Sequence, residues 1–205
     1  MGLYADHVLP RIINLACGMK TADPFRQRVA AGLAGQVVEI GFGSGLNVPH
    51  YPAAVTAVSA VEPSDVGWKL AGERVRRSQV PIRRAGLDGQ RLPFADDTFD
   101  AALSTWTMCT IPDVGAALRE LRRVLRPGAT LHFIEHGLAP DEKVRRTQRR
   151  LEPLNKRVFG GCHLTRPIVD LIRGAGFEVT ELDTFYEPGA PRFVAADSLG
   201  VAVSR

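Results

Sequence analysis

A glycine-rich turn directly after a short apolar run is the feature that most constrains the fold of this chain. Residues 37–47 are VVEIGFGSGLN, in which VVEI is typical of a buried strand and glycines then occupy positions 41, 43 and 45. Glycine adopts a positive φ without strain and has no Cβ to obstruct a ligand. The pattern predicts a strand, a loop and a short helix over residues 46–48, with backbone that comes close to a bound molecule.

The rest of the chain predicts strands that alternate with helices. Helices are expected over residues 65–78 and from an N-cap at Asp113 to a stop at Pro127-Gly128. The expected strands are residues 37–40, 54–62, 80–85, 99–105, 129–136, 177–185 and 193–203. The last two leave no room for a helix between them, which predicts an antiparallel hairpin. The elements together predict an α/β fold with a mostly parallel seven-stranded sheet, this C-terminal hairpin and helices on both faces.

Two further helical segments are predicted from proline, glycine and threonine. Residues 1–35 form a helical segment that breaks near Pro10 and again over residues 18–24. Near the C-terminus, Thr165 has the side chain of an N-cap, and Pro167 suits the first turn of the last helix.

Composition narrows the class of protein. The chain has 205 residues, 45% of them hydrophobic and 23% charged, which suits one globular domain over residues 1–205. It has no apolar run of 18 residues, and its N-terminus lacks the charged-then-apolar order of a signal peptide. The three cysteines are too scattered for a disulfide framework or for metal-ligand spacing, so we expect a cytoplasmic protein without a metal.

The net charge of +4 owes much to a basic segment over residues 141–157. A solvated helix face would account for this segment, and so would contact with an anionic membrane surface or an acidic substrate. Because no aromatic residues lie between these charges, we expect no nucleic-acid partner.

A carboxylate near the end of the second strand indicates what the glycines bind. Glu62 follows Gly41 by 21 positions, and a carboxylate there can accept both hydroxyls of a ribose. It would repel a 2′-phosphate, which disfavours NADP. A dinucleotide and S-adenosylmethionine remain open, but the dinucleotide fingerprint has a small residue where this chain has Leu46. S-adenosylmethionine carries an ammonium group, which the acidic Glu39 suits.

The loop after the third strand is a candidate for binding adenine. Asp88 can accept from the adenine amino group, and the backbone N–H of Gly89 or Gln90 can reach a ring nitrogen. The alternative is a surface loop with an ordinary aspartate.

Several segments resemble known families. VVEIGFGSG, VEPS, LDGQRLPFADDTFDAALST and ELRRVLRPGATLHFIEHG are similar to the successive motifs of class I S-adenosylmethionine-dependent methyltransferases, over roughly residues 36–175. DGQRLPFADDTFD resembles the ubiquinone/menaquinone C-methyltransferase group. STWTMCTIPD, FIEHG and FGGCHLTR resemble the methyltransferase-like family that includes mammalian membrane-associated alkyl thiol methyltransferases.

This resemblance implies a Rossmann-like fold and S-adenosylmethionine as cofactor, with S-adenosylhomocysteine as product. The implied cofactor-binding residues are Glu39, Gly41, Gly43, Gly45, Asn47, Glu62, Pro63, Asp88, Gly89 and Thr105. The glycines would surround the methionine part, Glu39 would hold the ammonium side through water or the loop backbone, and Thr105 would lie near the sulfonium. The chain departs from the family at Phe42, where a small residue or cysteine is usual, and we expect no apolar N-terminal anchor.

Methyl transfer from a sulfonium needs alignment of donor and acceptor, and it needs a base only for an acceptor that keeps its proton. His136, at the end of the fifth strand, is the first candidate base and His163 is the second. A hydrogen bond to nearby backbone and helix capping are their alternative roles. Cys109 and Cys162 could line a pocket for a soft, apolar acceptor, or they could be buried small hydrophobic residues.

Two segments are expected to cover the site, by analogy with class I enzymes. Residues 139–164 would form a basic, lid-like insertion over the acceptor. The N-terminal segment over residues 1–35, including Tyr4 and His7, would close over the cofactor.

These observations favour methyl transfer from S-adenosylmethionine to a small, apolar acceptor, with a thiol or sulfide first. A quinone-type or lipid acceptor is the alternative. The rivals from other classes are a cofactor-binding scaffold that does not catalyse and a nicotinamide oxidoreductase.

Overall fold

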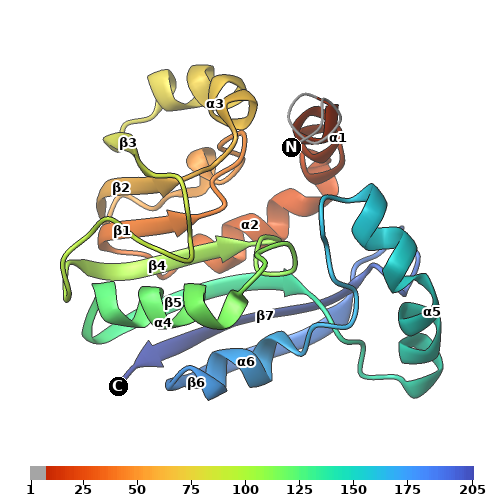
Figure 1. Cartoon of the computed structure of the whole chain (residues 1–205). Helices are drawn as coiled ribbons and strands as arrows, with labels where there is room; N and C mark the ends of the chain where they lie inside the picture. The colour runs from red at the N-terminus through yellow and green to blue at the C-terminus, as the bar shows by residue number, and fades with distance from the viewer. Residues whose placement is uncertain (1–7) are drawn as a thin grey trace.

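The computed structural model describes residues 8–205 and contains one mixed β-sheet with helices on both faces (Figure 1). Within the described chain the sheet has seven strands in the order β3-β2-β1-β4-β5-β7-β6. The first five in the chain pair in parallel, whereas β7 runs antiparallel to both β5 and β6. The predicted fold and its C-terminal hairpin are confirmed.

The strands lie close to their predicted positions. They are β1 (Gly35–Ile40), β2 (Val55–Val61), β3 (Ile82–Gly86), β4 (Phe99–Thr105), β5 (Leu125–His136), β6 (Phe177–Tyr186) and β7 (Ala196–Ser204). The largest difference is β5, which begins four residues before its predicted start at 129. Gly128, with φ at +81°, lets the strand continue past Pro127.

Helices α4 (Val114–Val124) and α6 (Ile168–Gly174) cover one face of the sheet, and α2 (Asp23–Ala30) covers the other (Figure 1). The Asp113 carboxylate accepts from the Ala116 N–H at 2.8 Å, which confirms the predicted N-cap. The apolar stripe of α4 is buried against the sheet at Val114, Ala117, Leu118, Leu121 and Val124.

The predicted cap of the last helix is wrong. Thr165 donates its hydroxyl to Glu152 at 3.0 Å instead of capping α6, which begins at Ile168 without a side-chain cap. Pro167 lies just before the helix instead of in its first turn. Glu152 belongs to α5 (Glu142–Val158), so Thr165 ties the loop before α6 to the basic helix.

The N-terminal region holds α1 (Leu9–Cys17), a 3₁₀ turn (Lys20–Ala22) and α2. Pro10 lies in the first turn of α1, which begins at Leu9. Whether a break precedes it, as predicted, depends on residues 1–7, which lie outside the described residues. The break predicted over residues 18–24 is present as this turn. Tyr4 and His7 lie outside the described residues. None of the helices within residues 8–205 has both the length and the apolar composition that crossing a membrane requires.

The order of the strands fixes where a ligand can bind. The chain passes from β1 outward to β3 and then returns to β4 on the other side of β1. The carboxyl ends of β1 and β4 therefore form the switch point at which open α/β sheets bind ligands. Helix α3 (Asp65–Arg77) and a second 3₁₀ turn (Val48–His50) flank this point, the latter two residues after the predicted short helix.

Candidate active site

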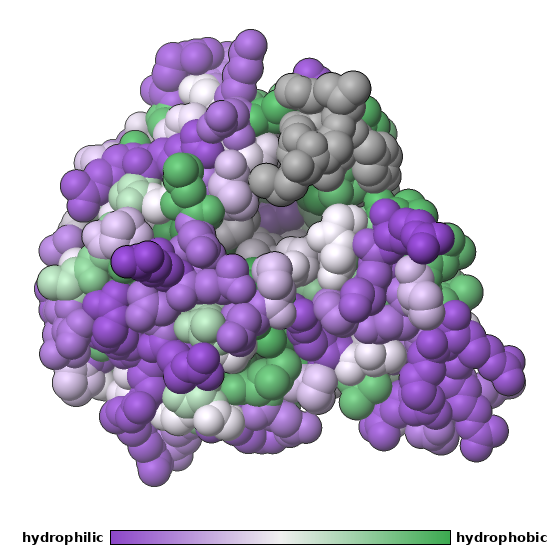
Figure 2. Space-filling model, viewed as in Figure 1, coloured by the Kyte–Doolittle hydropathy of each residue, from purple (hydrophilic) through white to green (hydrophobic). Residues whose placement is uncertain are grey.

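A cavity of about 610 Å³ lies at this switch point, beyond the ends of β1, β2 and β4. The space-filling view shows the molecule hollowed near its centre there (Figure 2). One side, which we call the glycine-loop wall, consists of residues 41–44, 62–64 and 87–90. A further part of the lining comes from α1 and from the loops after β4 and α5. This part, which we call the helical wall, consists of Leu9, Pro10, Ile13, Asn14, Cys17, Trp106, Thr107, Thr110, Ile111, Pro112, Phe159 and Gly160.

The three glycines of the motif serve different purposes, although all have a positive φ. A Cβ on Gly41 would lie 2.0 Å from the Thr107 hydroxyl, and one on Gly45 would lie 3.2 Å from Ala71. Of the three, only Gly43 could carry a Cβ without crowding a neighbour, since the nearest atom, the Gly41 carbonyl oxygen, would be 3.8 Å away. We expected all three to make room for a ligand, but Gly41 and Gly45 are required by packing within the protein.

Glu62 stands at the end of β2 with its carboxylate held by two backbone groups. Gly43 donates its N–H to one oxygen at 2.6 Å, and Ser64 donates to the other at 2.7 Å. Burial raises the pKa of Glu62, although the two N–H donors oppose this shift. Both Glu62 and the adjacent Pro63 line the cavity, as predicted residues of a nucleoside site should.

A buried polar network closes the base of the cavity. Asn47 donates to Glu39 at 2.9 Å and to Thr105 at 3.0 Å, while Arg26 donates to Asn47 at 2.7 Å. Asn47 and Thr105 line the cavity, but Glu39 lies behind Asn47 and does not. Burial raises the pKa of Glu39 to about 7, against the lowering effect of hydrogen bonds from Tyr51 and Asn47. Glu39 therefore makes no direct contact with the cavity and is linked to it by hydrogen bonding through the Asn47 amide.

Arg26 is the principal residue of the cavity that the sequence analysis missed. It is only 4% exposed, stacks over the Trp106 ring at 4.7 Å and donates to the Cys17 carbonyl at 3.1 Å. A signal for it exists, since Arg26 falls at helical spacing among Ala22, Val29 and Ala30, which are all buried. A basic residue on the buried face of a helix indicates an anionic partner.

The loop after β3 lies on the cavity, as predicted. Asp88 accepts from the backbone and side-chain N–H groups of Gln90 at 2.8 and 3.0 Å. Gly89 has open space where a Cβ would be, with Ile111 the nearest contact at 3.7 Å. The Asp88 side chain is exposed and shapes its own loop.

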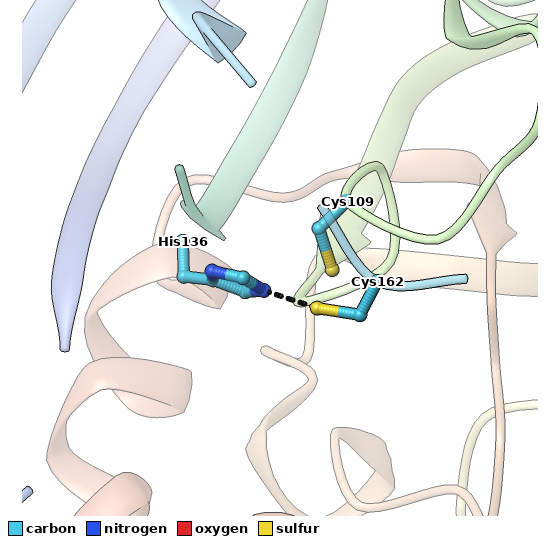
Figure 3. A group of neighbouring side chains, drawn as sticks. All are labelled: Cys109, His136 and Cys162. Carbon is cyan, nitrogen blue, oxygen red and sulfur yellow. Dashed lines mark hydrogen bonds between the residues drawn. The ribbon is translucent and has the colours of Figure 1, made fainter. Parts of the chain in front are cut away.

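Three side chains with metal-binding and nucleophilic atoms meet next to the cavity. His136, at the end of β5, contacts the Cys162 sulfur through Nε2 at 2.8 Å, and Cys109 points to the same space (Figure 3). The donor atoms of all three lie within 4.8 Å of one another. We call this group the Cys–His cluster. The sequence suggested no such group, because its members come from three separate segments.

The two thiols of the cluster have pKa values that are shifted in opposite directions. The pKa of Cys162 is lowered by hydrogen bonds from Cys109 and His136, whereas that of Cys109 is raised by the same contact and by burial. Burial disfavours a charge on His136, but its contact with Cys162 outweighs this and raises its pKa. Of the two thiols, Cys162 is therefore the one that more readily becomes a thiolate.

The two histidines named as candidate bases do not line the cavity. His136 is half-buried within the Cys–His cluster. His163 contacts Glu152 at 2.8 Å through Nδ1, and its backbone N–H donates to the Cys109 carbonyl at 2.9 Å. A catalytic role for either histidine stays a prediction.

Glu135 fixes the loop that separates the cluster from the cavity. Its carboxylate is fully buried and accepts from Ser104 and from the backbone N–H groups of Thr107 and Met108 at 2.7–3.1 Å. Burial raises its pKa to about 7. These bonds hold the turn after β4 in place, so that Thr107 faces the cavity.

Comparison with known proteins identifies the family. Residues 38–133 match the model of a methyltransferase domain. The human thiol S-methyltransferase TMT1B is 30% identical over 189 residues, which are 88% of this chain and 76% of that protein. The rat TMT1B is 32% identical over 153 residues, 72% of this chain, and this match spans 62% of the relative's length.

A different methyltransferase matches a shorter segment. The demethylmenaquinone methyltransferase of Mycolicibacterium paratuberculosis is 40% identical over 102 residues, which are 47% of this chain and 44% of that protein. The relatives thus agree on methyl transfer and differ in the acceptor.

Solved structures agree on the fold. A methyltransferase solved in complex with the Haloferax volcanii Trm112 activator has a TM-score of 0.73 at 18% identity, covering 98% of this chain and 96% of that one. The geranyl diphosphate C-methyltransferase of Streptomyces coelicolor, solved with S-adenosyl-L-homocysteine, has a TM-score of 0.67 at 14% identity, covering 92% and 78%. With its glycine loop, Glu62 and strand order, the chain belongs to the S-adenosylmethionine-dependent methyltransferases of the Rossmann-like class I fold.

Proposed function

We propose that this protein transfers the methyl group of S-adenosylmethionine to the sulfur of a small, apolar thiol. The observation that carries the proposal is the helical wall, which is largely apolar, adjoins the Cys–His cluster and lines the same cavity as a wall suited to a nucleoside. The names of the full-length relatives, thiol S-methyltransferases, support the same acceptor.

The glycine-loop wall fits the nucleoside part of the cofactor. The Glu62 carboxylate, which borders the cavity, would accept the ribose hydroxyls. Gly43 offers backbone with no side chain in the way, and Gly89 offers the same beside the adenine. We assign the ribose to Glu62 and Pro63 and the adenine to the loop of Asp88 and Gly89.

Arg26 completes the site at the amino-acid end of the cofactor. Its guanidinium lies at the base of the cavity beside Asn47 and Thr105. A guanidinium is suited to bind a carboxylate, and this one is buried, so the interaction is weakly screened by salt. The methionine carboxylate would bind Arg26, and the ammonium would face Asn47 and the carboxylate of Glu39 behind it.

Methyl transfer to a thiol requires little from the acceptor site beyond positioning of the thiol. Alignment of the sulfonium methyl with a nucleophile can lower the barrier by about 7–11 kcal/mol. A thiol has a reference pKa of about 8.5, so a fraction of it is already thiolate at neutral pH. A quinone-type carbon acceptor needs more help, and the observation that favours it is the local match to demethylmenaquinone methyltransferase.

A radiolabelled-methyl assay tests the acceptor directly. The purified protein is incubated with methyl-labelled S-adenosylmethionine and, in separate arms, small alkyl thiols, demethylated quinols, phenols and phospholipids. We expect label in the thiol arm. Label only in the quinol arm would favour the alternative acceptor. Binding of S-adenosylhomocysteine without label in any arm would favour a non-catalytic scaffold.

A surface beside the cavity mouth suits a lipid bilayer. Along α1, Val8, Ile12, Leu15 and Met19 form an exposed apolar stripe, with Leu15 77% exposed. The end of α5 adds further exposed apolar side chains at Leu154, Val158 and Phe159. Figure 2 shows apolar side chains on the side of α1 and α5, next to the strongly polar part of α5. The basic residues of α5 would attract anionic headgroups, so apolar acceptors would enter from the bilayer.

Sedimentation with vesicles tests this contact. The double variant Leu15→Ser/Leu154→Ser should bind phosphatidylserine vesicles less than the wild-type protein does. Leu182→Ser is the matched control, because Leu182 is 45% exposed on β6, outside this surface. Equal loss of binding in the control, or no binding by the wild type, would contradict the proposed membrane contact.

The three free cysteines suit a reducing compartment, and we place the protein in the cytoplasm.

A further inference from the structure

We propose that Cys109, His136 and Cys162 bind a zinc ion whose fourth coordination position receives the acceptor thiol. The metal-binding part stands on the geometry of the Cys–His cluster alone. The acceptor part rests on the proposed function.

The donor set matches zinc in number and kind. Two thiolates and one imidazole are the protein ligands of one class of catalytic zinc site, which keeps its fourth position open. The three donor atoms lie within 4.8 Å of one another. Tetrahedral zinc separates N and S ligands by about 3.5 Å and two S ligands by about 3.8 Å. His136 and Cys162, at 2.8 Å, would move apart by about 0.7 Å, which small side-chain rotations allow.

The backbone holds the two thiols in place by contacts that do not involve the thiols themselves. The His163 N–H donates to the Cys109 carbonyl at 2.9 Å, and the Asn155 side chain donates to the Cys162 carbonyl at 2.8 Å. The loops that carry the two cysteines are therefore joined through main-chain groups. Such preorganisation lowers the cost of assembling a metal site.

A second observation points to a ligand at His136. Among the described residues, His136 Nδ1 and Asp197 Oδ1 are both buried atoms without a hydrogen-bond partner. The two residues face each other across β5 and β7. A metal-binding histidine usually donates its other ring N–H to a carboxylate, which fixes the tautomer and orients the ring. Asp197, which pairs with His136 in the register of β5 and β7, would accept that hydrogen bond when Nε2 binds the metal, although the two atoms are not hydrogen-bonded in this structure.

The cluster adjoins the lining of the cavity, although none of its three residues lines it. Thr107 and Thr110, on either side of Cys109 in the chain, line the cavity, and so does Gly160, two residues before Cys162. His136 and Cys162 are half-buried, whereas Cys109 is buried. In the proposal the open coordination position faces these lining residues, and the acceptor reaches it from the cavity.

The reaction balances without any further reagent. The acceptor thiol would bind zinc as a thiolate and release its proton to solvent. The thiolate sulfur then donates an electron pair to the methyl carbon of S-adenosylmethionine. The bond from that carbon to the sulfonium breaks, and its electron pair stays on S-adenosylhomocysteine. The product thioether is a weaker ligand than a thiolate and leaves the metal.

Cobalt substitution tests the site without requiring turnover. The intact chain, kept reduced with a phosphine, is stripped of metal and titrated with Co²⁺. We expect one equivalent to bind, with tetrahedral d–d bands and a sulfur-to-cobalt charge-transfer band. Addition of 2-mercaptoethanol should intensify the charge-transfer band, since a third sulfur joins the metal. Absence of these bands in the wild type would overturn the metal site. Bands that do not change when 2-mercaptoethanol is added would overturn the proposal that the metal holds the acceptor thiol.

Variants show which atoms bind the metal. Cys162→Ser and Cys109→Ser should each lose the charge-transfer band or reduce it by about half, while Cys17→Ser, the third cysteine of the chain, should keep it in full. Asp197→Asn should weaken Co²⁺ binding about tenfold or more without abolishing the band. Circular dichroism checks that each variant folds. A band that survives in Cys162→Ser would count against the assignment.

The two proposals can fail separately. Thiol methylation by a protein that binds no cobalt would leave the proposed function in place and remove the zinc site. A cobalt spectrum that responds to thiol, without methyl transfer to any thiol, would do the reverse.

Discussion

The glycine-loop wall lines the cavity and the Cys–His cluster lies next to it, and the two regions are built differently. Each functional group of the glycine-loop wall comes from the turn that directly follows a strand, at residues 41–44, 62–64 and 87–90. The cluster joins residues 109, 136 and 162, which are 27 and 26 positions apart (136 minus 109, and 162 minus 136). The first region is specified by local sequence, whereas the second exists only once β4, β5 and the loop after α5 have been packed together.

The difference has a chemical side. The glycine-loop wall presents backbone and a carboxylate, which suit a ligand common to a whole family. The cluster presents sulfur and imidazole, which suit a particular acceptor. Substitutions in the glycine-loop wall should therefore alter cofactor affinity and leave the cluster intact. Substitutions in the cluster should leave cofactor affinity unchanged.

The largest expected effect separates two glycines of the same motif. Gly41→Ala forces a Cβ to within 2.0 Å of Thr107 at a φ of +67°, which should cost about 3 kcal/mol of unfolding free energy. Gly43→Ala has a similar backbone cost of about 1 kcal/mol but no clash within the protein. Its Cβ enters the cavity, so affinity for S-adenosylhomocysteine should fall about tenfold.

Urea unfolding and calorimetry of both glycine variants provide the measurements. The prediction concerns the order of the two effects. If Gly43→Ala were the less stable protein, the division between packing glycines and cavity glycines would be wrong.

The next effect concerns the ribose. Glu62→Gln keeps the shape of the side chain but removes the charge from the only hydrogen-bond acceptor that we assign to the ribose hydroxyls. A hydrogen bond to a charged group contributes about 1.5–3 kcal/mol, so affinity for S-adenosylhomocysteine should fall about thirtyfold. Calorimetry measures this loss. Cys162→Ser, in the Cys–His cluster, is the control and should bind S-adenosylhomocysteine within about twofold of the wild type. An equal loss of affinity in both variants would contradict the separation of the glycine-loop wall from the cluster.

Much of the fold was predictable because its signals are local. The strand over 99–105 and the N-cap at Asp113 lie where the apolar run and the short acidic side chain indicate. The cap predicted at Thr165 failed because Glu152, 13 residues earlier, competes for the same hydroxyl. A helix-start signal cannot show a partner from another helix.

The candidate site divides in the same way. Glu62 and Gly43 could be found from their spacing to a predicted strand, and both line the cavity. Arg26 belongs to no motif. Its helical spacing can indicate that it is buried, but its role depends on how α2 packs beside Asn47 and Trp106. The cysteine spacing argued against a metal, but spacing along the chain says nothing about cysteines on separate loops that the fold brings together.

A smaller effect is expected in the pH dependence of stability. The folded-state pKa of Glu39 is raised to about 7 from an ordinary value of 4.5. Between these values the folded protein binds more protons than the unfolded chain, so stability falls as pH rises through this window. Glu39→Gln removes the titrating group, so the variant should lose less stability than the wild type between pH 5 and pH 7, by an amount on the order of 1 kcal/mol.

Urea unfolding at the two pH values measures the difference made by Glu39. Glu135 and Asp197 also have pKa values raised to about 7, so part of the slope should remain in the variant. The exposed Glu73→Gln is the matched control and should keep the full wild-type slope. An unchanged slope in Glu39→Gln would mean that the carboxylate is ionised when folded, held in that state by Arg26.

The smallest effect is expected at the adenine loop, and it tests how far the family motif can be carried to this chain. Asp88 already accepts two hydrogen bonds from Gln90, and Gln90 in turn accepts from the Asp113 N–H at 2.9 Å. Because the carboxylate is exposed, water competes for any bond to the adenine amino group, so Asp88→Ala should weaken S-adenosylhomocysteine binding only about threefold. Asp88→Asn retains an oxygen that can accept from Gln90 and should recover most of this loss of affinity if Asp88 acts through the shape of the loop.

Calorimetry with S-adenosylhomocysteine and with its inosine analogue, which lacks the adenine amino group, separates the two roles of Asp88. If Asp88 binds the amino group directly, the variant and the wild type should bind the analogue equally well. If Asp88 only shapes the loop, the threefold difference should persist with both ligands.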